Sequence, residues 1–336
     1  GLRAMASMKQ NGVNVASDLL TAVALTGTPG GLVLVVCDDP GGISSTNEVD
    51  TRHYARLADV PLLEPATFQE AKDMVRWAFD LSEELELLCM VRSVTRISHA
   101  RGVVELGSLG RRERRARMTP DQRYASLPPC PKRKELKEKL ARAAALFEAS
   151  PFNRYRGPSR PELMVVTGGT GWWYASEAVR ILKVEDRVGI LKLGTTWPLP
   201  ESFLLRHLTA ARSVLVVEEP DPFLETNLGA LLLKARAAGG RRIPAVFGKL
   251  SGTIRGPYGP GVGEMNPDIV VEALRERLAI PVPSSRQAFR KRLEAEIDFP
   301  LPGREVAFCP GCPHRASYWV MKNALRLDGR DGLLIG

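Results

Sequence analysis

At 336 residues the chain is long enough for two or three domains, because a single hydrophobic core stops growing at roughly 250 to 300 residues. Its 44% hydrophobic and 25% charged residues are typical of a soluble globular protein, and no apolar run approaches the ~20 residues of a membrane span. The net charge of +9 comes largely from residues 111–117, where no aromatic residue interleaves with the arginines and no nucleic-acid motif accompanies them. We therefore expect no membrane and no nucleic-acid partner, and a solvated linker at this run.

The two ends of the chain both look cut. There is no initiator methionine and no signal peptide, and the chain stops at Gly336 within an expected strand at 332–335. The sequence is therefore interpreted as an internal fragment of a longer protein. Its five cysteines are too few and too scattered for a disulfide framework, which indicates a reducing, cytoplasmic location.

Strands and helices alternate along the chain, which predicts an α/β fold with parallel sheets. Strands are expected at 32–37, 60–65, 87–94, 163–167, 188–193, 213–217 and 332–335. Helices are expected at 13–27, 47–59, 69–86 with Thr67 as the cap, 132–149, 173–183, 201–210, 225–237, 267–278 and 284–296, and from the residues after Cys312 to about Leu327. Because the pattern starts afresh at 163, a second α/β domain is predicted there.

A polar loop follows the strand at 32–37. Residues 38–42 are turn-forming, and Asn47, Glu48, Arg52 and His53 follow within a few residues. In open α/β sheets ligands bind at the carboxyl ends of the strands. We therefore expect a substrate or cofactor to bind at this loop.

A second candidate site is the C-x-x-C of Cys309 and Cys312, which opens the last helix. Thiols near the positive end of a helix have a lowered pKa and can bind iron or zinc or exchange disulfides. One pair supplies two of the four usual ligands, with His314 as a third at most. The alternative is that proline and glycine shape a tight helix entry and the thiols take no part.

Several motifs, taken together, resemble one family. Residues 309–315, Cys-Pro-Gly-Cys-Pro-His-Arg, are similar to the opening of the thiamine-pyrophosphate domain in the alpha subunit of indolepyruvate:ferredoxin oxidoreductase. Residues 8–18, 38–45, 47–55 and 95–102 resemble further segments of that subunit, in the same order. The resemblance covers nearly the whole chain and is more specific than any single motif.

The resemblance implies an oxidative decarboxylation of arylpyruvates. Thiamine pyrophosphate, held with Mg2+, would attack the keto carbon, electrons would pass through 4Fe-4S iron–sulfur clusters to ferredoxin, and the acyl group would go to coenzyme A. A beta subunit would be the partner. The resemblance also places the glutamate that activates thiamine, the Mg2+ motif and the cysteine-rich tail outside this chain, so the fragment is expected to be inactive by itself.

Arg52 is the first choice for binding the substrate carboxylate, because a guanidinium offers a bidentate fork and the resemblance places such an arginine in this loop. The alternative is a salt bridge with Asp50 or Glu48. His53, Arg96 and His99 are further candidates for the same pocket, although each could simply fix a loop. Three more residues could line the pocket, or could cap and shape turns: Asn14, Asn47 and Glu48.

Two motifs in the second half receive structural interpretations. The turn at 168–171 could cradle a phosphate of coenzyme A, but a plain strand-to-helix turn explains it better. Glu218 and Glu219 could be paired carboxylates, and are interpreted as an interface or helix-cap feature.

The resemblance divides the chain into four parts. They are the distal part of a pyrimidine-binding domain (1–110), a basic linker with a helix (111–160), a transketolase-C-like domain (161–282), and a linker with the start of a pyrophosphate-binding domain (283–336). Two enzyme alternatives are a related 2-oxoacid:ferredoxin oxidoreductase for another substrate and a non-oxidative thiamine-dependent decarboxylase. An alternative of another class is a non-catalytic basic α/β binding protein.

Overall fold

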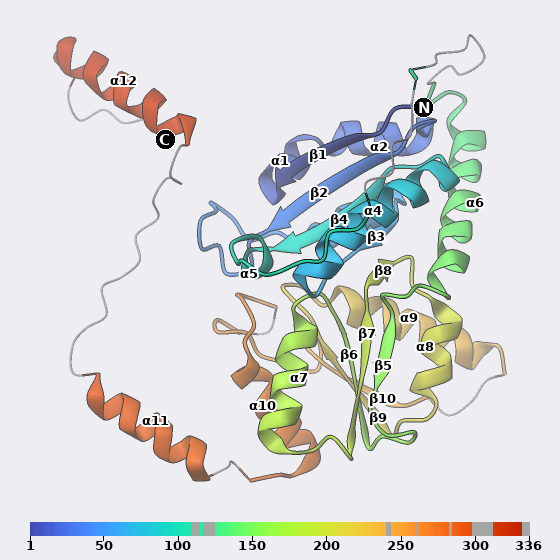
Figure 1. Cartoon of the computed structure of the whole chain (residues 1–336), viewed down its shortest axis with the longest axis vertical. Coiled ribbons are helices and arrows are strands. Elements are labelled where there is room, and N and C mark those ends of the chain that lie inside the picture. Colours follow the sequence, from blue (N-terminus) through green and yellow to red (C-terminus); the bar gives the residue numbers. More distant parts are fainter. Residues whose placement is uncertain are drawn as a thin grey trace.

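The computed structural model describes residues 1–108, 115–116, 125–239, 243–259, 261–281, 284–297 and 312–330. Within them the chain forms two mainly parallel sheets with helices on both faces, one sheet above the other in Figure 1. The predicted α/β class is therefore confirmed. The expected strand at 332–335 and most of the basic run at 111–117 lie outside the described residues.

The first sheet has the strand order β1-β2-β4-β3-β8. Its strands are β1 (Ala4–Lys9), β2 (Leu32–Asp38), β3 (Leu62–Leu63), β4 (Cys89–Val94) and β8 (Thr195–Trp197). The first four are parallel, whereas β8 runs antiparallel to β3. Since β8 comes from the second half of the chain, that half contributes a strand to the first sheet.

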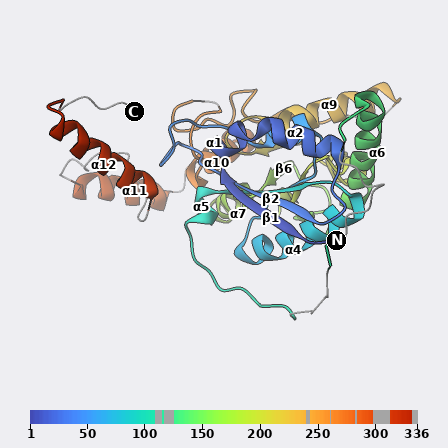
Figure 2. The same cartoon turned by 90° about the horizontal axis from the view of Figure 1, so that it is seen from above.

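Helices cover both faces of this sheet. They are α1 (Gln10–Val15), α2 (Ser17–Thr26), α3 (Arg52–Ala58), α4 (Phe68–Leu85), α5 (Thr95–Ser98) and α6 (Pro129–Phe147). Seen from above, α1 and α2 lie on one face and α4 on the other (Figure 2). Although α6 belongs to the expected linker, it buries Leu136, Leu140, Ala143 and Phe147 and so forms part of the first core.

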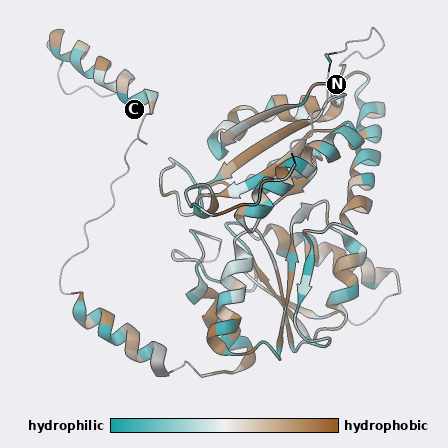
Figure 3. Ribbon diagram, in the orientation of Figure 1, coloured by the Kyte–Doolittle hydropathy of each residue, from teal (hydrophilic) through white to brown (hydrophobic). Residues whose placement is uncertain are grey.

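The second sheet has the order β10-β9-β6-β7-β5. Its strands are β5 (Arg154–Arg156), β6 (Leu163–Gly168), β7 (Val188–Leu193), β9 (Ser213–Val217) and β10 (Ala245–Phe247). All are parallel except β5, which pairs antiparallel with β7. The central strands of both sheets are apolar and lie between more polar helices (Figure 3), as expected for strands buried on both faces.

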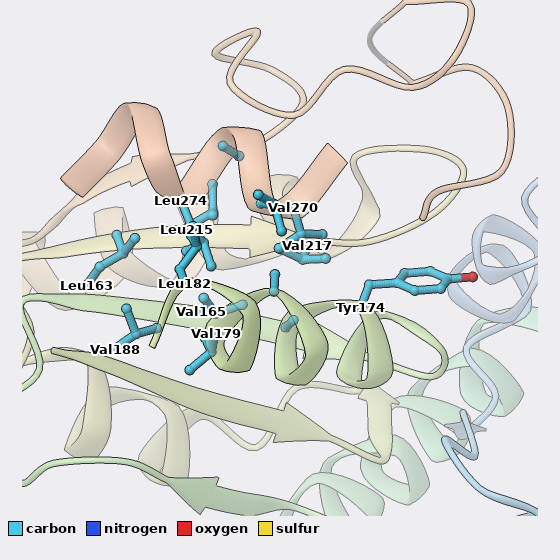
Figure 4. Packing of buried hydrophobic residues seen from close by; sticks show 14 of the residues in the cluster. Leu163, Val165, Tyr174, Val179, Leu182, Val188, Leu215, Val217, Val270 and Leu274 are labelled. Atoms are coloured by element: carbon cyan, nitrogen blue, oxygen red, sulfur yellow. The ribbon is translucent and has the colours of Figure 1, made fainter. Parts of the chain in front are cut away.

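Four helices cover the two faces of the second sheet. They are α7 (Gly171–Leu182), α8 (Glu201–Leu208), α9 (Phe223–Ala237) and α10 (Pro267–Leu278). On one face α7 and α10 pack side by side over the sheet through aliphatic side chains such as Val179, Leu215 and Leu274 (Figure 4). On the other face α8 and α9 bury leucines that include Leu204 and Leu228. The second α/β unit therefore has its own two-sided core.

Two helices stand apart from both sheets. α11 (Ser284–Glu296) and α12 (Pro313–Leu327) lie away from the rest in both views (Figures 1 and 2), and no residue of α12 is buried. Within the described residues, no helix combines the length and the apolar character that crossing a membrane requires.

Most predicted elements are present, but four strands were not predicted: β1, β5, β8 and β10. Three of them have only three residues, too short for a clear pattern. β1 is an edge strand with exposed residues, so it lacks the apolar run that marked β2. Two predicted helices differ: 13–27 is two helices broken at Ala16, and the helix expected at 47–59 begins only at Arg52.

Candidate functional site at the junction of the two sheets

The polar loop after β2 and the end of β9 meet at the junction of the two sheets. Arg52, which begins α3, lies 1% exposed between them. Its Nε and Nη2 donate to Asp50, and its Nη1 donates to Glu218 Oε2 at 2.8 Å. Nη2 also reaches the backbone carbonyl of Asp221. Arg52 is therefore a buried link between the two units.

A second buried arginine, Arg92, comes from the middle of β4. Its Nε donates to Asp38 Oδ2 and its Nη1 to Glu64 Oε1, both at 2.5 Å, and its Nη2 donates to the Glu219 carbonyl at 3.0 Å. Asp38 also accepts from the backbone and hydroxyl of Thr51. These contacts connect the ends of β2, β3 and β9.

Glu218 and Glu219, at the end of β9, make different contacts. Glu218 accepts from the backbone N–H groups of Leu224 and Glu225, which open α9, and it also pairs with Arg52. Glu219 accepts from the Thr170 hydroxyl and from the Met265 backbone. The interpretation as an interface or helix-cap feature is therefore confirmed for Glu218, whereas in the described part of the chain the Glu219 side chain hydrogen-bonds only with residues of the second unit.

The junction carries more acidic than basic groups among the described residues. Its buried charged side chains are Asp38, Asp50, Glu64, Glu218, Glu219, Arg52, Arg92 and Lys249. Burial raises the pKa of Asp38, Glu218 and Glu219 despite the nearby arginines. At Asp50 burial acts in the same direction, but the charges of Arg52 and Arg92 outweigh it and lower the pKa to about 2.

A small cavity lies inside this cluster. It has a volume of about 10 Å³ and is lined by residues that include Glu64, Arg92, Gly168 and Glu219. Within the described part of the chain, Glu64 Oε2 has no hydrogen-bond partner. The cavity has room for about one water molecule, so it cannot hold a ring system.

The turn at 168–171 faces carboxylates of the chain itself. The Thr170 hydroxyl lies 2.6 Å from Glu219 Oε1, and Gly168 lines the cavity beside Glu64. At Gly171 a Cβ would lie 2.1 Å from Thr167 Oγ1, so the close packing of helix on strand requires glycine. This environment supports the plain turn rather than a phosphate cradle.

His53 lies beside Arg52 but points to the rim of the junction. Its Nε2 is 3.3 Å from Asp221 Oδ2, and both side chains are about half exposed. The hydrogen bond with Asp221 raises the pKa of His53 against the opposing effect of burial. Asp50, His53 and Asp221 bring three oxygen and nitrogen atoms close together, but Asp50 is already bonded to Arg52.

Glu48 and Arg96 meet the same short segment of the second unit. Glu48 Oε1 accepts from the backbone of Gly41 at 2.6 Å and of Gly263 at 3.1 Å. The Arg96 guanidinium pairs with Glu264, with Nη2 and Oε2 2.8 Å apart. The structure thus brings these two predicted residues to one place at the outer edge of the junction.

The other predicted residues are spread out. Asn14 accepts from the Tyr54 hydroxyl at 2.6 Å, and the Asn47 carbonyl accepts from Gln10. His99 is exposed at the end of α5. Cys312 is the N-cap of α12, with Sγ 3.3 Å from His314 Nδ1, while Cys309 lies outside the described residues. The roles predicted for all nine candidates stay predictions.

Sequence reasoning missed Asp38, Glu64 and Arg92 as parts of the junction. Arg92 carried a usable signal, because an arginine inside the apolar run of β4 must be paired when that strand is buried. The sequence did not indicate that Asp38 and Glu64 would be its partners, since each lies at the end of a different strand.

No family model matches the chain. Over 98% of its length, however, it is 38% identical to the indolepyruvate oxidoreductase subunit IorA of Methanothermobacter thermautotrophicus, of which it covers 51%. It is 36% identical to subunit IorA of Pyrococcus abyssi, over 96% of the chain and 49% of that relative. The chain thus spans about half the length of these curated relatives.

One solved structure supports the fold. The 2-oxoglutarate:ferredoxin oxidoreductase of Magnetococcus marinus, a structure with 2-oxoglutarate, coenzyme A and succinyl-CoA bound, matches with a TM-score of 0.53 and 14% identity, covering 82% of this chain and 53% of that one. At this identity the match concerns the fold alone. By sequence, the chain is similar to indolepyruvate oxidoreductase subunit IorA along about half of that subunit.

Proposed function

We propose that the chain is part of the catalytic subunit of a thiamine-dependent oxidoreductase that converts arylpyruvates to aryl-acetyl-CoA and passes the electrons to ferredoxin. The observation that carries this proposal is the 38% identity to subunit IorA over 98% of the chain. The two parallel sheets and their fold match to a 2-oxoacid:ferredoxin oxidoreductase support it.

The cavity at the junction does not accommodate thiamine pyrophosphate. The cavity at the junction is about 10 Å³, too small for a pyrimidine ring, and the turn at 168–171 faces Glu64 and Glu219 rather than an open anion site. In this proposal thiamine pyrophosphate and Mg2+ are bound by further residues of the enzyme. The junction forms one rigid side of the cofactor site.

Iron–sulfur clusters, a beta subunit, ferredoxin and coenzyme A also belong to the proposal. Cys312 lies at the start of α12 beside His314, a position where a thiolate can be a metal ligand. In the complete subunit, Cys312→Ser should lower the iron content, with Cys130→Ser as the control because Cys130 is an exposed free thiol that also lies near the start of a helix. Equal iron in both variants would remove Cys312 from the cluster site.

The function is tested with the complete subunit purified together with its partner. Indolepyruvate, coenzyme A and oxidised ferredoxin are supplied, and the reduction of ferredoxin and the formation of indole-acetyl-CoA are followed. We expect both products, each dependent on added thiamine pyrophosphate.

The possible results separate the alternatives. Release of CO2 with an aldehyde and no reduced ferredoxin would indicate a non-oxidative decarboxylase. Faster turnover of an aliphatic 2-oxo acid would indicate a related oxidoreductase. No turnover of any 2-oxo acid, with salt-dependent retention of DNA on a filter, would favour the basic binding protein.

A further inference from the structure

Arg96 is the arginine of the junction that is open to solvent. Arg52 and Arg92 are 1% and 4% exposed, and their nitrogens donate to buried carboxylates. By contrast, the Arg96 side chain is 47% exposed. It follows β4, at the carboxyl edge where ligands of α/β sheets bind.

Although exposed, Arg96 is held in one orientation. Its Nε lies 3.1 Å from Glu264 Oε1 and its Nη2 lies 2.8 Å from Glu264 Oε2, which is the bidentate arrangement of a guanidinium and a carboxylate. Its guanidinium carbon lies 5.5 Å from the centre of the Tyr174 ring, within the range of a cation–π contact.

Glu264 is itself held by the polar loop of the first sheet. The Glu48 carboxylate accepts from the backbone N–H of Gly263. Gly41, with a φ of +83°, lies so close that a Cβ there would be 3.3 Å from the Glu264 backbone nitrogen. The loop after β2 therefore sets the position of Glu264, and Glu264 sets that of Arg96.

Tyr174 supplies a second polar group at the same place. The residue is 3% exposed, and its hydroxyl has no hydrogen-bond partner in the described structure. Its phenol points away from the aliphatic cluster between α7 and α10 (Figure 4). Burial raises the pKa of Tyr174 well above its usual value, so the hydroxyl stays a neutral donor. A buried donor without an acceptor suits a ligand oxygen.

We propose that Arg96 and the Tyr174 hydroxyl form a binding site for the carboxylate of the 2-oxo acid, with Glu264 as the positioning residue for Arg96. This inference rests on the proposed function, and it assigns the carboxylate to the exposed Arg96 rather than to the buried Arg52. Charge-assisted hydrogen bonds from a guanidinium and a neutral one from a phenol match the acceptors of a carboxylate.

The test compares two competitive inhibitors of the complete enzyme, indole-3-propionate and its uncharged amide. The wild type should prefer the acid, and Arg96→Gln should reduce that preference about tenfold or more, because it removes a charged hydrogen-bond donor. The KM for indolepyruvate should rise more than kcat falls. Arg101→Gln, an exposed arginine a few residues later, should keep the wild-type preference.

Further variants distinguish carboxylate binding by Arg96 from a purely structural ion pair between Arg96 and Glu264. Tyr174→Phe should reduce the acid preference severalfold, and Glu264→Gln should lower kcat/KM, with partial rescue by Glu264→Asp. Arg96→Lys keeps the charge and should fall between wild type and Arg96→Gln. An unchanged acid preference in an active Arg96→Gln enzyme would refute the carboxylate site, whereas a wild-type enzyme without activity on 2-oxo acids would refute the proposed function itself.

Discussion

Arg52 and Glu218 lie 166 positions apart in the sequence and form a buried ion pair, with Nη1 and Oε2 2.8 Å apart. The pair connects the start of α3 with the residue that caps α9. Since Asp50 holds the other side of the same guanidinium, Arg52 is fixed from both units at once. The salt bridge with Asp50, which the sequence left open as the alternative for Arg52, is present.

Arg52→Lys should lower the free energy of unfolding by about 2 to 4 kcal/mol. Lysine has no planar fork, so at least one buried carboxylate would lose its donor. Denaturant unfolding of the chain measures this change. Arg160→Lys, at an exposed arginine, should stay within about 0.5 kcal/mol. Equal stability of both variants would show that the ion pair does not hold the units together.

The pair of His53 and Asp221 should make a small contribution that depends on pH. The folded-state pKa of His53 is raised, so the stabilisation is fully present below its unfolded value of about 6.5 and is lost as the pH rises through the folded value. Both side chains are about half exposed, which limits the effect to ~1 kcal/mol or less. The stability difference between wild type and His53→Gln should shrink from pH ~5.5 to pH ~8.5, and a constant difference would contradict the pair.

Asp50 should contribute to the acid sensitivity of the chain. Its folded-state pKa is depressed to about 2, so its stabilisation is present above the unfolded value of about 3.9 and is lost as the pH falls towards 2. The amount is about 2 kcal/mol. The stability gap between wild type and Asp50→Asn should therefore narrow between pH ~5 and pH ~2.5, and a constant gap would contradict this contribution.

Thr67 should behave as the N-cap of α4. Its hydroxyl accepts from the Glu70 backbone at 3.1 Å, and the Glu70 carboxylate accepts in return from Ala66. Thr67→Ala should cost about 1 kcal/mol of unfolding free energy, and Thr67→Ser, which keeps the oxygen, should cost much less. Equal losses in the two variants would assign the effect to the lost methyl group.

The elements that the sequence predicted best are those whose pattern is complete within one segment. The apolar run of β2 and the capped, amphipathic α4 needed no information from elsewhere, and both were predicted within one residue or so. β8 was missed because three residues carry no period, and its pairing with β3 depends on the far half of the chain.

The site shows the same division. The loop after β2 was predicted to be functional because its polar residues crowd behind a buried strand. The sequence could not indicate that Arg52 would turn inward to Glu218 or that Arg96 would face Glu264, since both acids come from the second unit. Pairings between charges so far apart in the chain depend on how the two sheets dock, which no local pattern records.

The shared strand β8 also bears on how the protein is made. The first sheet lacks its edge strand until Thr195–Trp197 has been synthesised, so β3 stays unpaired on that side while the intervening residues 64–194 are made. A nascent chain arrested before this point would present an open strand edge, which is a template for aggregation. The first sheet is therefore complete only after part of the second half has been synthesised.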